Sequence, residues 1–136
     1  QSSGCAPAQR IGSLAACEAI PNARLCEQAR LEASLTHFDP DAGAASAVVA
    51  IVTRLLMRGY DQEEVDAYME QHEREAWSLV AQTSIGNGGT GYEAVHLAWD
   101  CLWSEQPSMQ LCESISSANN YAGPILGAFL GAQRLI

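Results

Sequence analysis

Residues 117–136 read SANNYAGPILGAFLGAQRLI, a short polar segment that runs directly into an apolar segment rich in small residues. Gly123 and Pro124 suit the start of a helix, because proline at the first helical position gives up an amide that would be unpaired there anyway. Gly127 and Gly131 stand four residues apart and each precedes an alanine, so one face of this helix is nearly bare backbone. The stretch predicts a central core helix that another helix approaches closely, with a short polar loop before its first turn.

The length and composition are those of one globular domain covering residues 1–136. The chain is 48% hydrophobic and 17% charged, which is typical of a folded protein rather than a disordered one. A single domain of this size can bury a sizeable core. The sequence contains no run of 18 apolar residues, so we expect no membrane span.

The charge of the chain is strongly acidic. Sixteen acidic residues stand against seven basic ones, all of them arginine, which gives a net charge of -9. This excess argues against non-specific nucleic-acid binding, which depends on neutralising phosphates with cationic side chains. It also argues against an anionic membrane surface, and it is compatible with a cation or a basic protein surface as the partner.

The cysteines follow no metal-binding or CxxC spacing, and they number five: Cys5, Cys17, Cys26, Cys101 and Cys112. Because the number is odd and several of them lie on apolar helical faces, we expect free thiols in a reducing, cytoplasmic setting. Residue 1 is Gln rather than Met, so we expect either that an upstream segment has been removed or that this is a piece of something longer.

Hydrophobic periodicity predicts helices and no strands, so the fold class is all-α, an orthogonal multi-helix bundle of about six or seven helices. After a loop-like start at 1–9, the expected helices are listed here by residue number: 10–20, 23–35, 40–58, 62–80, 91–103, 107–115 and the tail from 123 onward.

Capping signals mark the ends of these helices. Four expected starts carry a side chain that can accept a hydrogen bond from a backbone amide: Asn22, Asp39, Asp61 and Thr90. A glutamate three residues after each of the last two completes a capping box. Gly59 is the expected stop of the helix that begins after Asp39, and Arg54 and Arg58 should complement its C-terminal dipole. Capping explains Asp39 and Asp41 more simply than a cation site does.

The first candidate site is the glycine-rich loop at 82–91, which contains Gly88 and Gly89. It has neither a Walker lysine nor a preceding strand, so a phosphate loop of the familiar kinds is not supported. The loop still delivers the N-terminus of a helix, and helix N-termini can hold anions.

The second candidate site is the loop at 117–123, where Asn119, Asn120 and Tyr121 precede the tail helix. Amide and phenol side chains at a helix start are able to line a binding site. The sequence holds no GxSxG or HExxH motif and no credible serine or cysteine triad, so we assign no catalytic residue.

Three segments stand in a characteristic order along the chain. They are QRIGSL at 9–14, ARLEASLTHFDPDA at 29–42, and GYEAVHLAW at 91–99 followed by GAFLGA at 127–132. Together they resemble the C-terminal half of the ADP-ribosylglycohydrolase family, which includes the dinitrogenase-reductase-activating glycohydrolases. In that family the second segment carries a Leu-Thr-His pattern, on which His37 falls, and a Gly-Asp-x-Asp loop precedes a Gly-Ala-x-x-Gly-Ala helix.

The resemblance implies an all-α fold and hydrolysis of the glycosidic bond of ADP-ribose with two bound magnesium or manganese ions, which carboxylates suit as ligands. The paired aspartates of the family's last loop fall on Ala118 and Asn120 here. Alanine cannot ligate a metal and asparagine offers one neutral carbonyl, so we predict no metal site. The family's N-terminal half, with its Gly-Asp metal motif, does not match any part of this chain.

The ligand-binding candidates are therefore Asn119, Asn120, Tyr121, Gly88, Gly89 and His37. Three functions remain open for them. The first is a degenerate or split glycohydrolase-like protein, inactive as this chain alone, that binds an ADP-ribose-like nucleotide or a partner chain such as an upstream half. The second is a metal-independent glycohydrolase-like enzyme. The third is a small acidic helical interaction protein of the inhibitor or immunity type, whose charge would suit a basic cleft. Small-residue faces at 42–47 and 123–132 also predict self-association.

Overall fold

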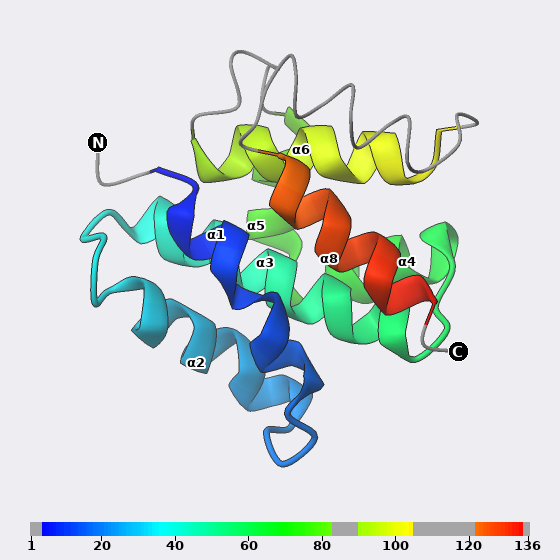
Figure 1. The fold of residues 1–136 in the computed structure, drawn as a ribbon, viewed down its shortest axis with the longest axis horizontal. Coiled ribbons are helices and arrows are strands. Elements are labelled where there is room, and N and C mark those ends of the chain that lie inside the picture. Colours follow the sequence, from blue (N-terminus) through cyan, green and yellow to red (C-terminus); the bar gives the residue numbers. More distant parts are fainter. Residues whose placement is uncertain (1–3, 83–89, 105–121, 135–136) are drawn as a thin grey trace.

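The computed structural model describes residues 4–82, 90–104 and 122–134. Within these ranges the chain forms seven α-helices and one 3₁₀ helix (Figure 1): α1 (Ala6–Arg10), η1 (Ile11–Ala16), α2 (Asn22–Ala33), α3 (Pro40–Met57), α4 (Gln62–His72), α5 (Arg74–Gln82), α6 (Gly91–Leu102) and α8 (Gly123–Gln133). The described ranges contain no β-strand. Gly4 and Thr90 form an isolated antiparallel β-bridge there. The predicted all-α class is confirmed, while the helix expected at 107–115 lies outside the described residues.

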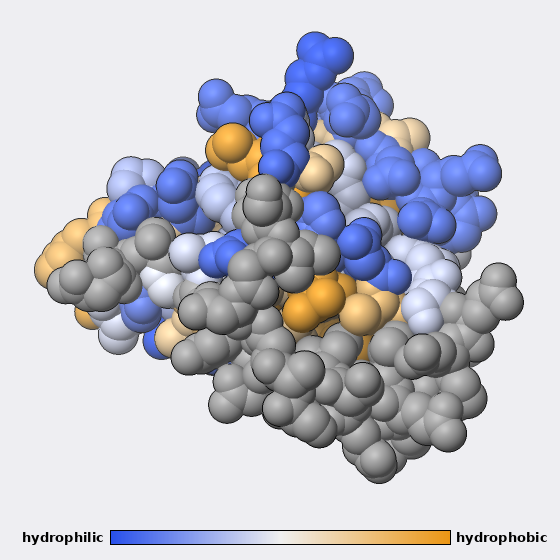
Figure 2. Space-filling model, turned by 90° about the horizontal axis from the view of Figure 1, so that it is seen from above, coloured by the Kyte–Doolittle hydropathy of each residue, from blue (hydrophilic) through white to orange (hydrophobic). Residues whose placement is uncertain are grey.

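The surface reflects the acidic composition. On the face shown in Figure 2 most described residues are hydrophilic, with smaller apolar areas between them. Five ion pairs join arginines to glutamates within or between helices: Arg10–Glu32, Arg24–Glu27, Arg30–Glu73, Arg58–Glu18 and Arg74–Glu70. Because acidic residues outnumber arginines by sixteen to seven, the surface keeps a net negative charge.

Helix α3 is the centre of the bundle. Asp39 caps it, because its carboxylate accepts the Asp41 amide at 2.8 Å, and Gly59 ends it with φ at 89°, as predicted. Fourteen of its 18 residues are buried, and the other six described α-helices all contact it. Its length and hydropathy would suffice to cross a membrane, but 78% of the helix is buried inside the protein, which is the position of a core helix.

Helix α8 is less central than the sequence predicts. It begins at Gly123 and buries one face against the bundle, through Ile125, Leu126, Phe129 and Ala132. The expected helix contact at Gly127 and Gly131 is wrong for the described chain, since both are exposed and no described atom lies within 4 Å of a Cβ placed there. Large side chains bury more apolar area than glycine does, so they face the core instead. Helix α8 instead approaches η1 closely at Ala128, because a Cβ placed at Gly12 would be 3.1 Å from the Cβ of Ala128.

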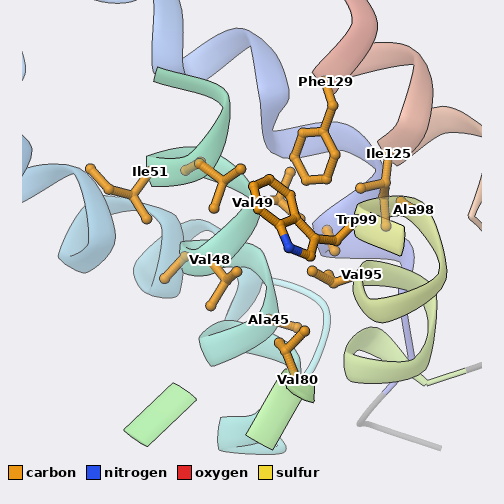
Figure 3. Close-up of a cluster of buried hydrophobic side chains, with 14 of the residues drawn as sticks. Ala45, Val48, Val49, Ile51, Val80, Val95, Ala98, Trp99, Ile125 and Phe129 are labelled. Atoms are coloured by element: carbon orange, nitrogen blue, oxygen red, sulfur yellow. The ribbon is translucent and has the colours of Figure 1, made fainter. Parts of the chain in front are cut away.

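The core joins three helices through interlocking rings and branched side chains. Figure 3 shows Val49 of α3 beside the indole of Trp99 on α6, with Phe129 of α8 against the same indole. The Trp99 and Phe129 rings meet edge to face with centroids 6.2 Å apart, and Trp77 of α5 meets Trp99 in the same way at 5.2 Å. Such edge-to-face pairs add to the free energy of simple burial.

The N-terminal segment departs from the predicted loop at 1–9 and helix at 10–20. Helix α1 already begins at Ala6, with Pro7 in its first turn, where a proline is tolerated. The chain then tightens into the 3₁₀ helix η1, which ends at Ala16.

The buried side chain of Arg54 explains why no helix continues beyond η1. Instead of complementing the dipole of α3, its guanidinium is 0% exposed and donates to the carbonyl oxygens of Ala15 at 3.0 Å, Cys17 at 2.7 Å and Ile20. Carbonyls bound in this way are not available to a regular helix, so residues 17–21 form an irregular loop.

The predicted cap of α2 is also wrong. Pro21 occupies the capping position and makes no side-chain hydrogen bond. The Oδ1 atom of Asn22 instead accepts from Nη1 of Arg54 at 3.2 Å and from Nη1 of Arg58 at 3.1 Å. A tertiary contact with α3 therefore replaces the local cap that the sequence suggests.

The single helix predicted at 62–80 is two helices that meet at Glu73, whose backbone leaves the helical region with φ at -137° and ψ at 43°. The bend brings the indole N–H of Trp77 within 3.2 Å of Asp66 Oδ1. In a straight helix these residues would stand about 16 Å apart along the axis. The hydrophobic stripe runs unbroken through this region, so the sequence pattern alone gives no sign of the bend.

Candidate functional site

Three helices begin at one end of the bundle, where Figure 1 shows the starts of α1, α3 and α6. The bridge between Gly4 and Thr90 joins the segments that lead into α1 and α6. Pro40 in the first turn of α3 lines a groove together with Tyr92 in the first turn of α6. We call this region the helix-start end. Because the N-termini of helices carry partial positive charge, such an end favours anionic groups.

Helix α8 begins beside the end of α1. Pro124 at its start lines a groove with Gln9 of α1, and further along Ala128 lies against Gly12 of η1. This order of contacts shows that α8 runs in the same direction as α1 and η1. Of the two loops predicted from the sequence, the one at 82–91 leads into α6 at the helix-start end, and the one at 117–123 leads into α8.

A groove of about 380 Å³ opens beside the first turns of α3 and α6, and we call it the Arg30 groove. It is lined by Arg30 of α2, Asp41 of α3, Glu73 at the α4–α5 junction and Tyr92 of α6, with further residues of α3 and α5. The guanidinium of Arg30 pairs with Glu73 at 3.5 Å and is 44% exposed. Burial, followed by the charge of Asp41, raises the pKa of the Tyr92 phenol. The groove therefore offers two exposed guanidinium groups, of Arg30 and Arg74, and a neutral phenol among carboxylates.

His37 lies in a neighbouring pocket of about 240 Å³, which shares Arg30 and Pro40 with the Arg30 groove. Its Nδ1 atom is 2.9 Å from the Thr36 hydroxyl, which accepts a hydrogen bond from Arg10 Nη2 at 2.9 Å. These contacts fix the His37 loop to α1. The next residue, Phe38, is 89% exposed at the rim of the pocket.

The other candidate residues cannot be placed. Gly88 and Gly89, together with Ala118, Asn119, Asn120 and Tyr121, lie outside the described residues. Thr90, which follows the first loop, caps α6 by accepting the Glu93 amide at 3.3 Å, as its capping box predicts.

Two groove residues were not singled out by the sequence. Arg30 and Tyr92 come from helices more than 60 positions apart, so no local pattern connects them. Each nevertheless falls inside one of the resembling segments, at 29–42 and 91–99, and those segments are the signal that would have found them.

The side chains of the described ranges do not form a dinuclear magnesium or manganese site. In the described part of the chain no group of three or more His, Cys, Asp or Glu residues is arranged to hold a metal ion. The Asp39 carboxylate is used as a helix cap. At the positions where the resemblance would require aspartates, Ala118 and Asn120 supply no carboxylate.

Comparison with known proteins gives one finding. A family model described as ADP-ribosylglycohydrolase matches residues 1–135, which is nearly the whole chain. No curated protein and no solved structure matches significantly.

Proposed function

The chain belongs to the ADP-ribosylglycohydrolase family, and we propose that it is a degenerate member that binds an ADP-ribose-like nucleotide without metal-dependent hydrolysis. One observation carries the proposal: residues 1–135 match the family, yet Ala118 and Asn120 stand where its paired aspartates are expected. Divalent cations of the magnesium type need charged oxygen ligands, so the loss of two carboxylates removes most of their affinity. No step through a metal is therefore assigned.

In this proposal the nucleotide lies at the helix-start end. Its diphosphate is proposed to contact the exposed guanidinium of Arg30. The backbone amides of Gly88 and Gly89 and the side chain of His37 are proposed as further contacts. Asn119, Asn120 and Tyr121 are proposed to hydrogen-bond the ribose hydroxyls, which suits neutral amides and a phenol.

Isothermal titration of the chain with ADP-ribose tests this placement. Arg30→Ala is expected to weaken binding by about tenfold, because it removes a charge-assisted contact to the diphosphate. Arg24→Ala is the matched control, since Arg24 is also an exposed arginine of α2 that pairs with a glutamate, but lines none of the pockets described here. Equal effects of the two substitutions would reject the Arg30 contact, and no heat with any form of the chain would reject nucleotide binding.

A hydrolysis assay on ADP-ribosylated arginine or serine peptides tests the degenerate state. We expect no turnover by the parent chain. The double substitution Ala118→Asp with Asn120→Asp is expected to restore magnesium binding and, where a longer parent protein supplies the rest of the site, hydrolysis. Turnover by the parent chain in EDTA would support the metal-independent enzyme instead.

Binding of a partner chain is a second candidate, favoured by apolar side chains at the surface. Leu31, Leu35 and Phe38 are 57%, 78% and 89% exposed and follow one another from the end of α2 into the next loop. Folded monomers seldom expose several large apolar side chains together unless another surface covers them. Light scattering that shows a clean monomer would count against self-association through them.

A further inference from the structure

A second cavity lies between α4, α5 and α6 and shares no residue with the helix-start end. Its volume is about 190 Å³, well above the roughly 10–15 Å³ that one water needs. Its walls combine two carboxylates, one imidazole and two indoles: Asp66, Asp100, His96, Trp77 and Trp99. None of the functional predictions uses these residues.

The charge of this cavity is not balanced by an arginine. All seven arginines of the chain lie in its described part, and none of them lines the cavity. Asp66 Oδ1 accepts a hydrogen bond from the indole N–H of Trp77 at 3.2 Å, which is a neutral donor. Burial raises the pKa of Asp66, and Glu70 one turn along α4 raises it further, while the Trp77 hydrogen bond lowers it. A carboxylate in this position gains stability from any cation that reaches it.

His96 offsets only part of the negative charge. Its Nδ1 atom is 2.6 Å from the carbonyl oxygen of Val80, and its Nε2 atom is 3.1 Å from Asp100 Oδ2. Even with His96 protonated, the two carboxylates leave the cavity with one net negative charge. The Asp100 side chain is 58% exposed, so its carboxylate lies where the cavity opens to solvent, and a small molecule can reach the cavity from that side.

The indoles supply the remaining wall. Trp77 and Trp99 meet edge to face with centroids 5.2 Å apart, so their ring planes stand at 76° to each other. Aromatic faces attract cations, and indole does so most strongly. A planar guanidinium both stacks on aromatic rings and donates several N–H groups in a fixed fork to carboxylates, which an ammonium group does less well.

We propose that the cavity between α4, α5 and α6 is a binding site for a guanidinium group, such as an arginine side chain of another molecule, with the half-buried Asp66 as its anionic anchor. The guanidinium would neutralise the net charge and lie against the indole wall, while Asp100 accepts a second N–H at the entrance. This site is separate from the proposed nucleotide site, and each can fail without the other.

The test uses methylguanidinium chloride as the probe and methylurea, which has a similar planar shape but no charge, as the matched neutral compound. The chain has three tryptophans, so its indole N–H signals can be followed and assigned in proton–nitrogen NMR spectra. Methylguanidinium should shift the Trp77 and Trp99 signals saturably at constant ionic strength. Methylurea should bind at least about tenfold more weakly, because it lacks the charge.

Asp66→Asn keeps the acceptor for Trp77 and removes the anion, so it should weaken methylguanidinium binding by about tenfold. Glu27→Gln removes one equal charge from exposed α2, away from the cavity, and should leave the affinity within about twofold. Asp100→Asn, at the exposed entrance, provides a second test if Asp66→Asn proves unstable. Absence of a saturable shift, equal binding of methylurea, or equal losses with the α2 control would each overturn the proposal.

Discussion

Replacing Arg54 by methionine should destabilise this fold more than replacing any exposed arginine by methionine. The guanidinium is 0% exposed and pairs with no carboxylate of the described residues. It binds the backbone carbonyl of Ala15 in η1, those of Cys17 and Ile20 in the loop that follows, and the amide oxygen of Asn22. Methionine fills much of the same volume but donates no hydrogen bond. The loop would then lose these contacts with α3 and keep the ion pair between Glu18 and Arg58.

The expected magnitude follows from these contacts. Hydrogen bonds to a charged group contribute about 1.5–3 kcal/mol each, but burying the charge itself costs several kcal/mol, and the exposed Cys17 carbonyl can turn to water when its partner is lost. We therefore expect a net loss of about 3–5 kcal/mol in the free energy of unfolding, which is typical of breaking a buried polar network. Arg54→Lys keeps the charge but loses the planar fork, so its loss should be smaller and still measurable.

Urea unfolding followed by circular dichroism measures this loss. With a slope of about 2 kcal/mol per molar urea, the middle of the usual range, the midpoint should fall by about 1.5–2.5 M for Arg54→Met. Arg24→Met, an exposed arginine in a surface ion pair, should change the free energy of unfolding by no more than about 0.5 kcal/mol. A loss below about 1 kcal/mol for Arg54→Met would refute the view that this side chain organises the loop.

Three further outcomes follow from the described contacts. Gly12→Ala should cost about 1–2 kcal/mol, because its Cβ would lie 3.1 Å from that of Ala128, whereas Gly127→Ala, with open space around it, should stabilise the helix by about 0.5–1 kcal/mol; thermal melts of the two variants should move in opposite directions. Burial raises the pKa of Cys26 from 9.0 to about 12, so its contribution to stability is full below pH 9 and is lost as the pH rises toward 12; the unfolding curve of Cys26→Ala should lack this part of the pH dependence, and identical pH profiles would contradict it. Asp39→Ala should lower stability by about 1 kcal/mol through loss of the α3 cap, while Asp39→Asn should retain most of it.

The features that the sequence predicted correctly depend on neighbouring residues. The cap at Asp39, the capping box that begins at Thr90 and the glycine stop at Gly59 each act within one turn of a helix, so a short stretch of sequence contains the whole interaction. The free thiols were also predicted correctly for the two buried cysteines of the described part, Cys5 and Cys26, although Cys17 is exposed and Cys112 lies outside that part.

The features that the sequence missed depend on partners far along the chain. Asn22 looks like a cap, but two arginines of α3 bind its side chain instead. Gly127 looks like a packing surface, but the larger side chains of α8 face the core. The bend at Glu73 interrupts no visible pattern of apolar residues in the sequence.

The candidate site also has parts that could be predicted from the sequence and parts that could not. Glycine and polar residues indicated the two loops, the family resemblance added His37, and the family is confirmed by the match over residues 1–135. The Arg30 groove could not be predicted, because it forms only when α2, α3 and α6 pack together. The roles of Asn119 and Asn120 stay predictions, since both lie outside the described residues.

The most direct test of the account is one pair of titrations of the chain with ADP-ribose, in magnesium chloride and in EDTA at equal ionic strength. If Ala118 and Asn120 have removed the metal site, the two dissociation constants should agree within about twofold. Binding that appears only with magnesium, or that becomes at least about tenfold tighter with it, would contradict the loss of metal chemistry on which the proposed function rests.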